Sequence, residues 1–266
     1  MSVITAHAAG TFCWPELSTS DLSGAKKFYT ALFGWEPDDV PMPEGGAYTM
    51  LKVGGNDVGA MAMMQEEQKK AGVPAHWMSF VAVTNADETV QRAAALDGTL
   101  LAGPFDVMEA GRMAVIKDPT GAIFSDWQAK AHPGATRINE VGGLVWTVLY
   151  TNDMKKAVAF YTGLFDWTAK PMENSPTPYT IFSFKGQEKM AGGALEMTKE
   201  MQGMPPHWLP YFQVEDADKT VDRSRELGGN VIVPPMDIPN VGRMATIADP
   251  QGAAFAVIKL SGAQGG

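Results

Sequence analysis

The chain has 266 residues, of which 45% are hydrophobic, so its length and composition suit two globular domains with sizeable cores. A net charge of −9, from 21 basic and 30 acidic residues, argues against nonspecific binding to nucleic acid or to an anionic membrane surface. The single cysteine excludes an intramolecular disulfide, and with no signal-like N-terminus and no apolar run near the ~20 residues of a membrane span, we expect a cytoplasmic protein.

The first elements in chain order predict a β-α-β-β unit. Residues 12–18 are half apolar and predict a strand, after which Ser20 or Asp21 can cap a helix that ends near Gly34. Strand-like runs follow at 47–53 and 58–64, on either side of a Gly-Gly-Asn turn, and one more short strand could complete the unit. Residues 65–74 are polar and predict a loop.

A second unit of the same kind follows. Residues 76–83 are apolar on both faces and predict a buried strand, and a helix then runs from Asn85 or Asp87 to about Gly98. Short strands are expected at 99–101, 112–117 and 122–127, the last two joined by the turn sequence Asp-Pro-Thr-Gly.

The same pattern then repeats. The stretch GRMAVIKDPTGAIF at 111–124 returns at 242–255 as GRMATIADPQGAAF, so that Asp249 follows Asp118 by 131 residues. Residues 145–167 likewise match residues 13–35. A repeat of this length is domain-sized, which predicts one fold present twice: residues 8–130, a Pro- and Gly-containing linker at 131–143, and residues 144–261.

Two of these motifs carry a family resemblance. The helix sequence FYTALFGW (28–35) and the hairpin DPTGAIF (118–124), with their second copies, resemble the vicinal-oxygen-chelate superfamily of glyoxalases, bleomycin-resistance proteins and dioxygenases, in particular the tandem glyoxalase-like proteins of actinobacteria. The resemblance implies an α+β fold of two tandem domains, each with two βαβββ modules that form a curved mixed sheet around a cleft. It also implies a small-molecule ligand and intramolecular domain pairing, in a monomer or a homodimer.

Metal-dependent members hold an ion in that cleft. The resemblance places their ligand positions near Trp14, Met78 and Ser125, near Met61–Met63, and at the corresponding residues Trp146, Leu209, Ala256 and Ala194-Leu195 of the second copy. Indole, thioether and alkyl groups do not bind hard divalent ions, so we expect no metal and no cofactor. His76 and His207 could recruit a metal if the register slipped, or could be strand-start residues in His-Trp packing pairs.

Glu16 is the candidate catalytic residue. It lies two residues after Trp14 and so shares its strand face, and in an apolar cleft its carboxyl would have a raised pKa suited to general acid or base catalysis. The alternative is a solvated or arginine-paired edge residue. The second copy has Val148 at this position.

Aromatic and sulfur-containing side chains could wall an apolar ligand pocket, although core packing uses the same residue types. The candidate ligand-binding residues, with Gln213 as a polar anchor, are Trp14, Tyr48, Met63, Phe80, Trp146, Tyr179, Tyr211 and Gln213. Tyr29 and Tyr161 lie on the buried helix stripe and are interpreted as structural. Arg112 and Arg243 suit an ion pair or backbone cap at the hairpin with Asp118 and Asp249, or anion recognition in the cleft.

Three functions remain open. The first is a metal-free protein of the bleomycin-resistance type that binds a small apolar or aromatic molecule. The second is a glyoxalase-type lyase, isomerase or hydroxylase that uses Glu16 as base, with or without a recruited divalent metal. The third is a degenerate scaffold whose clefts are filled by side chains.

Overall fold

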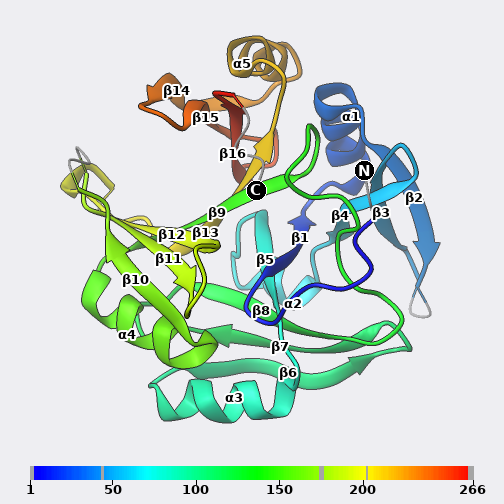
Figure 1. Cartoon of the computed structure of the whole chain (residues 1–266). Coiled ribbons are helices and arrows are strands. Elements are labelled where there is room, and N and C mark those ends of the chain that lie inside the picture. Colours follow the sequence, from blue (N-terminus) through cyan, green and yellow to red (C-terminus); the bar gives the residue numbers. More distant parts are fainter. Residues whose placement is uncertain (1–2, 43–44, 174–176, 202, 263–266) are drawn as a thin grey trace.

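The computed structural model describes residues 3–42, 45–173, 177–201 and 203–262, and within these residues it has two sheets of eight strands each (Figure 1). The N-terminal sheet and its helices comprise β1 (Phe12–Thr19), α1 (Leu22–Phe33), β2 (Glu36–Pro41), β3 (Ala47–Val53), β4 (Asn56–Met63), α2 (Glu66–Lys70), β5 (His76–Ala82), α3 (Ala86–Ala95), β6 (Thr99–Val107), β7 (Gly111–Lys117) and β8 (Ile123–Ala129).

The second half repeats this order. Its elements are β9 (Leu144–Thr151), α4 (Met154–Phe165), β10 (Trp167–Pro171), β11 (Tyr179–Phe184), β12 (Met190–Glu196), the 3-10 turn η1 (Lys199–Met201), β13 (His207–Gln213), α5 (Ala217–Glu226), β14 (Asn230–Ile238), β15 (Gly242–Ala248) and β16 (Ala254–Leu260). The α+β class and the two βαβββ modules per repeat are therefore as predicted from the sequence.

Each sheet joins its two modules through their first strands. The strand order is β2-β3-β4-β1-β5-β8-β7-β6 in the first sheet and β10-β11-β12-β9-β13-β16-β15-β14 in the second. β1 pairs antiparallel with β5, whereas β4 pairs parallel with β1 and β8 pairs parallel with β5. The centre of each sheet is thus built from the first and last strands of both modules.

The repeated helices begin and end where the sequence predicts. The Asp21 side chain accepts a hydrogen bond of 2.9 Å from the Gly24 N–H at the start of α1, and Gly34 ends the helix with a φ of 70°. Asp153 caps α4 in the same way, through the Lys156 N–H. At the other end of α4 Asp166, with a φ of 54°, takes the left-handed position that glycine fills in α1.

Three segments differ from the sequence interpretation. The optional short strand is a full edge strand, β2, whose residues are all exposed, which is why its hydrophobic pattern is weak. β6 continues to Val107 rather than ending at Leu101, because bulges let this exposed strand stay paired with β7. The polar stretch 65–74 contains the five-residue helix α2, stabilised by a capping box between Gln65 and Gln68.

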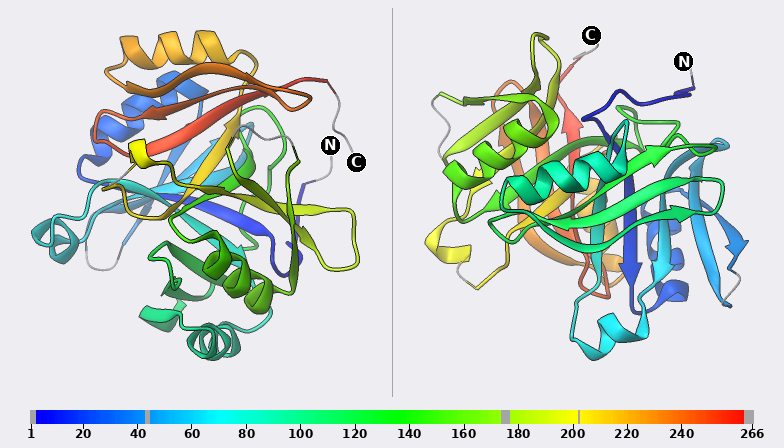
Figure 2. Two further views of the ribbon diagram at one scale, coloured as in Figure 1. Left: turned by 90° about the vertical axis from the view of Figure 1, so that its left-hand side faces the viewer. Right: turned by 90° about the horizontal axis from the view of Figure 1, so that it is seen from below.

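The two halves pack through their helix-covered faces rather than through their sheet edges. α1 lies beside α5, and α3 lies beside α4 (Figure 2). The Phe28 ring of α1 contacts Phe255 of β16, and Phe160 of α4 contacts Phe124 of β8. Each first-module helix therefore also covers the opposite sheet, and one hydrophobic core cluster runs through both halves.

Among the described residues, the helices are all too short or too polar to cross a membrane.

Candidate functional site

Each sheet has an outer face, which the helices cover, and an inner face, which they leave open. Strand alternation decides which side chains reach the inner face. Leu17 of β1 belongs to the core cluster between sheet and helices, whereas Trp14 belongs to a separate cluster on the inner face. Glu16 lies directly opposite Met78 of β5, and Trp14 lies opposite Phe80, so these four side chains share the inner face as predicted.

The N-terminal inner face is apolar and partly covered. Its buried cluster, with partly buried Tyr48, Met50, Met78 and Met113 at its margin, consists of Cys13, Trp14, Ala60, Phe80, Ala82, Trp127 and Ala135. The segment joining the two halves crosses one end of it, where the Ala135 N–H donates to the Cys13 carbonyl at 2.8 Å. The His132 ring meets Trp14 edge-on at 4.8 Å between centroids. The predicted linker is thus a wall of the cleft, a role that its composition did not indicate.

A chain of hydrogen bonds ends on Glu16. Trp14 Nε1 donates to Tyr48 Oη at 3.1 Å, and Tyr48 Oη donates to Glu16 Oε2 at 2.6 Å. Burial raises the pKa of the Glu16 carboxyl, and the hydrogen bond from Tyr48, which favours the ionised form, offsets only part of that rise. Glu16 is therefore a half-buried carboxyl held by a tyrosine, and among the described residues no arginine pairs with it.

The C-terminal inner face is lined by tyrosines. Trp146 Nε1 donates to Tyr179 Oη at 2.8 Å, which repeats the Trp14–Tyr48 contact. Tyr150 and Tyr211 are 9% and 6% exposed, and they belong to the inner-face cluster together with Val148 and Leu209. Burial raises the pKa of Tyr179 to about 12, so its hydroxyl stays protonated at neutral pH and can both donate and accept.

Tyr150 was missed by the sequence analysis. It stands four residues after Trp146 on β9, and strand alternation alone places it on the same face. Its ring stacks on His207 with centroids 5.1 Å apart and an interplanar angle of 3°. Its counterpart in the first half is Ser18, so comparison of the two copies gave no signal at this position.

Two candidate ligand residues lie apart from the aromatic groups. Met63 pairs with Thr19 and is 44% exposed on the outer face, because the inner face of β4 is taken by Ala60 and Ala62. The prediction that Met63 lines the cleft is therefore wrong by one residue of strand alternation. Gln213 does lie on the inner face of β13, where its Oε1 is buried without a hydrogen-bond partner among the described residues.

The histidines and arginines have local partners. His76 and His207 reach the inner face at the start of β5 and β13, and in each the Nδ1 atom lies about 3 Å from the carbonyl of a preceding proline, at 2.9 and 3.0 Å. Trp77 points to the opposite face, where its Nε1 donates to Tyr29 Oη, so the expected His-Trp packing pair does not form. His76 and Trp77 are neighbours in the chain, but their side chains lie on opposite faces of the sheet.

Arg112 and Arg243 form ion pairs, although with other partners than the hairpin aspartates. Arg112 binds Asp87 of α3 through Nε and Nη2 and Asp106 through Nη1, and Arg243 does the same with Asp218 and Asp237. Asp118 instead accepts hydrogen bonds from the backbone N–H groups of its own turn. These arginines therefore tie a helix to an edge hairpin.

Comparison with known proteins agrees with this architecture. The family model described as "Glyoxalase/Bleomycin resistance protein/Dioxygenase superfamily" matches residues 6–125 and again residues 143–257. The chain belongs to this superfamily. Members similar to it over nearly their whole length include "Putative glyoxylase CFP32" of Mycobacterium tuberculosis, 43% identical over 95% of this chain and 96% of the relative. "Anthracycline biosynthesis protein DnrV" of Streptomyces peucetius is 34% identical over 97% of this chain and 96% of the relative.

Solved structures of the superfamily share the fold. The Mn(II)-bound glyoxalase from Novosphingobium aromaticivorans superposes with a TM-score of 0.65 over 94% of this chain and 82% of the other, at 14% identity. A mutant of 4-hydroxymandelate synthase from Streptomyces coelicolor superposes with a TM-score of 0.62 over 98% of this chain and 95% of the other, also at 14% identity. At this level of identity the likeness concerns the fold alone.

The residues at which the sequence predicts metal-ligand positions in the first half lie on the inner face of its sheet. The inner-face positions on β1, β5 and β8 are occupied by Trp14, Met78 and Ser125, and Ser125 Oγ is buried without a partner among the described residues. In the described part of the chain, His, Cys, Asp and Glu side chains do not converge in any group of three that could hold a metal ion.

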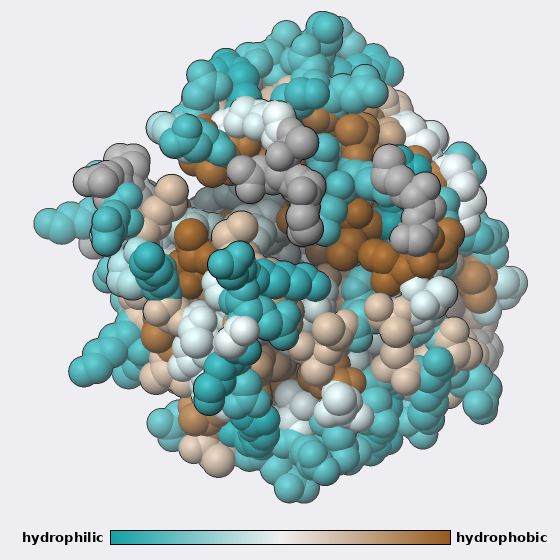
Figure 3. All heavy atoms as spheres, in the orientation of Figure 1, coloured by the Kyte–Doolittle hydropathy of each residue, from teal (hydrophilic) through white to brown (hydrophobic). Residues whose placement is uncertain are grey.

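The surface is hollowed beside the C-terminal inner face. Figure 3 shows this hollow between the β14–β15 hairpin and the β10–β12 strands. A separate cavity of about 260 Å³ lies at the end of the N-terminal inner face, between the N-terminal segment, Trp127 and the crossing segment at Lys130. This volume is slightly below the ~300 Å³ that is the lower end of the range for small-molecule pockets.

Proposed function

We propose that this superfamily member binds a small planar aromatic molecule on the inner face of its C-terminal sheet, without a metal ion. The observation that carries the proposal is the gathering of Trp146, Tyr150, Tyr179 and Tyr211 on one face, with hydroxyl groups that stay protonated. Flat rings and uncharged hydroxyls suit a ligand that presents aromatic faces and a few carbonyl or hydroxyl oxygens. Two relatives are named for anthracycline biosynthesis, and anthracyclines contain fused aromatic rings.

The donor set supports the metal-free part of the proposal. Indole at Trp14 and Trp146, thioether at Met78 and alkyl at Leu209 offer nothing that a hard divalent ion prefers. Glu16 adds a single carboxyl in the first half, and Val148 replaces it in the second. The residues present therefore do not fit the ion that related glyoxalases hold, and no step of the proposed function uses one.

Titration with 1,4-dihydroxyanthraquinone, followed by tryptophan fluorescence and calorimetry, tests this function. Trp146→Leu and Tyr211→Leu are each expected to weaken binding about threefold to tenfold, as the loss of one aromatic contact predicts. Trp14→Leu is the matched control, because it removes the equivalent indole from the N-terminal cleft. If Trp14→Leu weakened binding by this amount and Trp146→Leu did not, the site would lie in the N-terminal half. Absence of any binding would contradict the proposal.

Metal analysis of the purified protein completes the test, because stoichiometric zinc, nickel, manganese or iron would contradict the metal-free assignment.

A second candidate function is acid–base catalysis by Glu16 in the N-terminal cleft, in a lyase, isomerase or hydroxylase reaction. It is favoured by one observation, the raised pKa of a half-buried carboxyl that Tyr48 holds at 2.6 Å on an apolar face. Proton abstraction next to a carbonyl is the step that such a carboxylate can perform. Once a substrate is found, Glu16→Gln must abolish turnover while leaving binding to the C-terminal cleft unchanged.

A further inference from the structure

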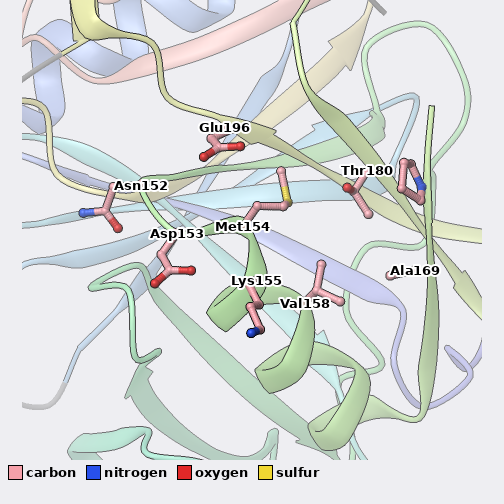
Figure 4. Close-up of a pocket in the computed structure, with 9 residues that line it drawn as sticks. Asn152, Asp153, Met154, Lys155, Val158, Ala169, Thr180 and Glu196 are labelled. Carbon is pink, nitrogen blue, oxygen red and sulfur yellow. The ribbon is translucent and has the colours of Figure 1, made fainter. Parts of the chain in front are cut away.

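A further cavity lies outside both inner faces. It has a volume of about 640 Å³ and is formed on the outer face of the C-terminal sheet, between the first turns of α4 and the strands β10, β11 and β12 (Figure 4). Its apolar wall consists of Met154, Val158, Ala169 and Pro171. None of the functions considered above uses it.

The equivalent place in the first half is filled by three side chains. Lys26 of α1 donates to both carboxylate oxygens of Asp39 on β2, at 2.6 and 2.7 Å. Thr49 Oγ1 of β3 also donates to Asp39 Oδ1, at 2.6 Å. This contact between ammonium, carboxylate and hydroxyl closes the gap between helix and edge strands.

The second half keeps only one of those three groups. By helix and strand register, the positions equivalent to Lys26, Asp39 and Thr49 are occupied by Val158, Pro171 and Thr180. Thr180 is 5% exposed, and its hydroxyl, which points into the cavity in Figure 4, has no hydrogen-bond partner among the described residues. The hydroxyl that serves a carboxylate in one half is thus unused in the other.

Charged groups stand at the mouth of the cavity. Lys155 is exposed near the N-terminal end of α4, and Glu196 is exposed at the end of β12, where the first half has Met63. Asp153 also lines the cavity, but its carboxylate already caps α4 through the Lys156 N–H. The cavity therefore presents an ammonium, a carboxylate and the Thr180 hydroxyl around an aliphatic wall.

We propose that this cavity is a second ligand site and that it takes a free amino acid with an aliphatic side chain. The ligand carboxylate accepts from Thr180 and pairs with Lys155, the ligand ammonium pairs with Glu196, and the side chain packs on Val158, Ala169 and Pro171. Such a ligand restores, in one molecule, the ammonium and carboxylate that Lys26 and Asp39 supply in the first half. The apolar wall replaces water with alkyl contacts and gives the site its preference for an aliphatic chain.

Calorimetry and saturation-transfer NMR with L-leucine test the site, with 4-methylpentanoate and 3-methylbutylamine as probes that lack the ammonium and the carboxylate. We expect leucine to bind at one molecule per chain and each single-charge probe to bind about tenfold more weakly, as the loss of one charged contact predicts. The double variant Val158→Lys with Pro171→Asp rebuilds the first-half contact and is expected to abolish leucine binding.

Thr180→Val gives a milder variant, should the double one not fold, and is expected to weaken leucine binding about tenfold. Thr49→Val removes the same hydroxyl from the filled half and is expected to leave leucine binding unchanged. No leucine binding, or equal binding by the double variant and by Thr180→Val, would overturn the proposal. The double variant is expected to bind dihydroxyanthraquinone as tightly as the wild type does, whatever the result with leucine. Failure of this site and failure of the proposed function can therefore be told apart.

Discussion

Tyr29 Oη donates a hydrogen bond of 3.0 Å to Oδ2 of Asp249, which lies 220 residues later in the chain. The second copy mirrors the contact, because Tyr161 Oη donates to Asp118 Oδ2 at 2.9 Å. The two motifs that repeat most clearly in the sequence, the FYT helix and the DPxG hairpin, thus meet each other across the two halves. Each aspartate uses its other oxygen to accept from its own turn.

Removing these hydroxyls should destabilise the pairing of the two halves. Tyr29→Phe leaves a buried carboxylate oxygen and the Trp77 N–H without their partner, so we expect a loss of about 1–3 kcal/mol in the free energy of unfolding. Urea denaturation measures it. Tyr161→Phe should cost about the same, and the double variant should show nearly additive losses because the sites are separate. A cost near zero for both would mean that the contacts add nothing to domain pairing.

Asp126 should make the protein less stable as the pH rises. Its side chain is 0% exposed, Oδ2 has no partner among the described residues, and burial raises its pKa to about 7. In the unfolded chain it ionises near its ordinary value, so between pH 4 and 7 the folded state holds more protons and stability falls with rising pH. At about 1.4 kcal/mol per unit of pKa difference the upper limit of this effect is about 4 kcal/mol.

Asp126→Asn tests this account, because it keeps an oxygen that can accept from the Ala114 N–H while it removes the charge. We expect higher stability than the wild type at pH 8 and a flatter dependence between pH 4 and 7, both measured by urea denaturation. The gain will fall short of the limit because the amide also buries an unpaired N–H group. The second half has Val257 at this position, so it offers no equivalent titration. An unchanged pH dependence would contradict the assignment.

Gly193 should control the geometry of the C-terminal cleft. It lies opposite Val148, and a Cβ atom built on it collides with the Tyr179 hydroxyl. Gly193→Ala is therefore expected to displace Tyr179, break its hydrogen bond with Trp146 and weaken dihydroxyanthraquinone binding about tenfold. Ala60 holds the equivalent position opposite Glu16, so Ala60→Gly is the matched control and should leave this binding unchanged. Unaltered affinity in Gly193→Ala would remove Tyr179 from the site.

If the N-terminal cleft is catalytic, its rate should depend on the ionisation of Glu16. Because burial raises the pKa of Glu16, a reaction that uses it as base should gain rate as pH rises through a midpoint above the ordinary glutamate value of about 4.3. Tyr48→Phe removes a hydrogen bond that favours the ionised form and should move the midpoint further up. Steady-state rates across pH give both midpoints, and a Glu16→Gln variant with full activity would exclude this role.

Much of the inner face could be predicted from alternation and from the repeat. Trp14, Glu16 and Phe80 share one face because side chains alternate along β1 and β5, and Trp146, Tyr179 and Tyr211 follow from the same rule in the second copy. The prediction for Met63 rested on its residue type alone, whereas successive residues of β4 point to opposite faces and Met63 lies on the outer one. Tyr150 was not predicted as a ligand-binding residue because its counterpart in the first half, Ser18, is small and polar.

The sequence by itself determined the duplicated α+β fold, the starts of its two repeated first helices and most of its inner-face aromatic residues, because these depend on local periodicity, capping and strand alternation. Only the tertiary structure decided that Tyr29 meets Asp249, that the segment with His132 and Ala135 walls one cleft, and that the Lys26–Asp39–Thr49 contact is missing from the second half. These relationships join residues far apart in the chain, and their distances depend on how two curved sheets pack, which no local pattern encodes.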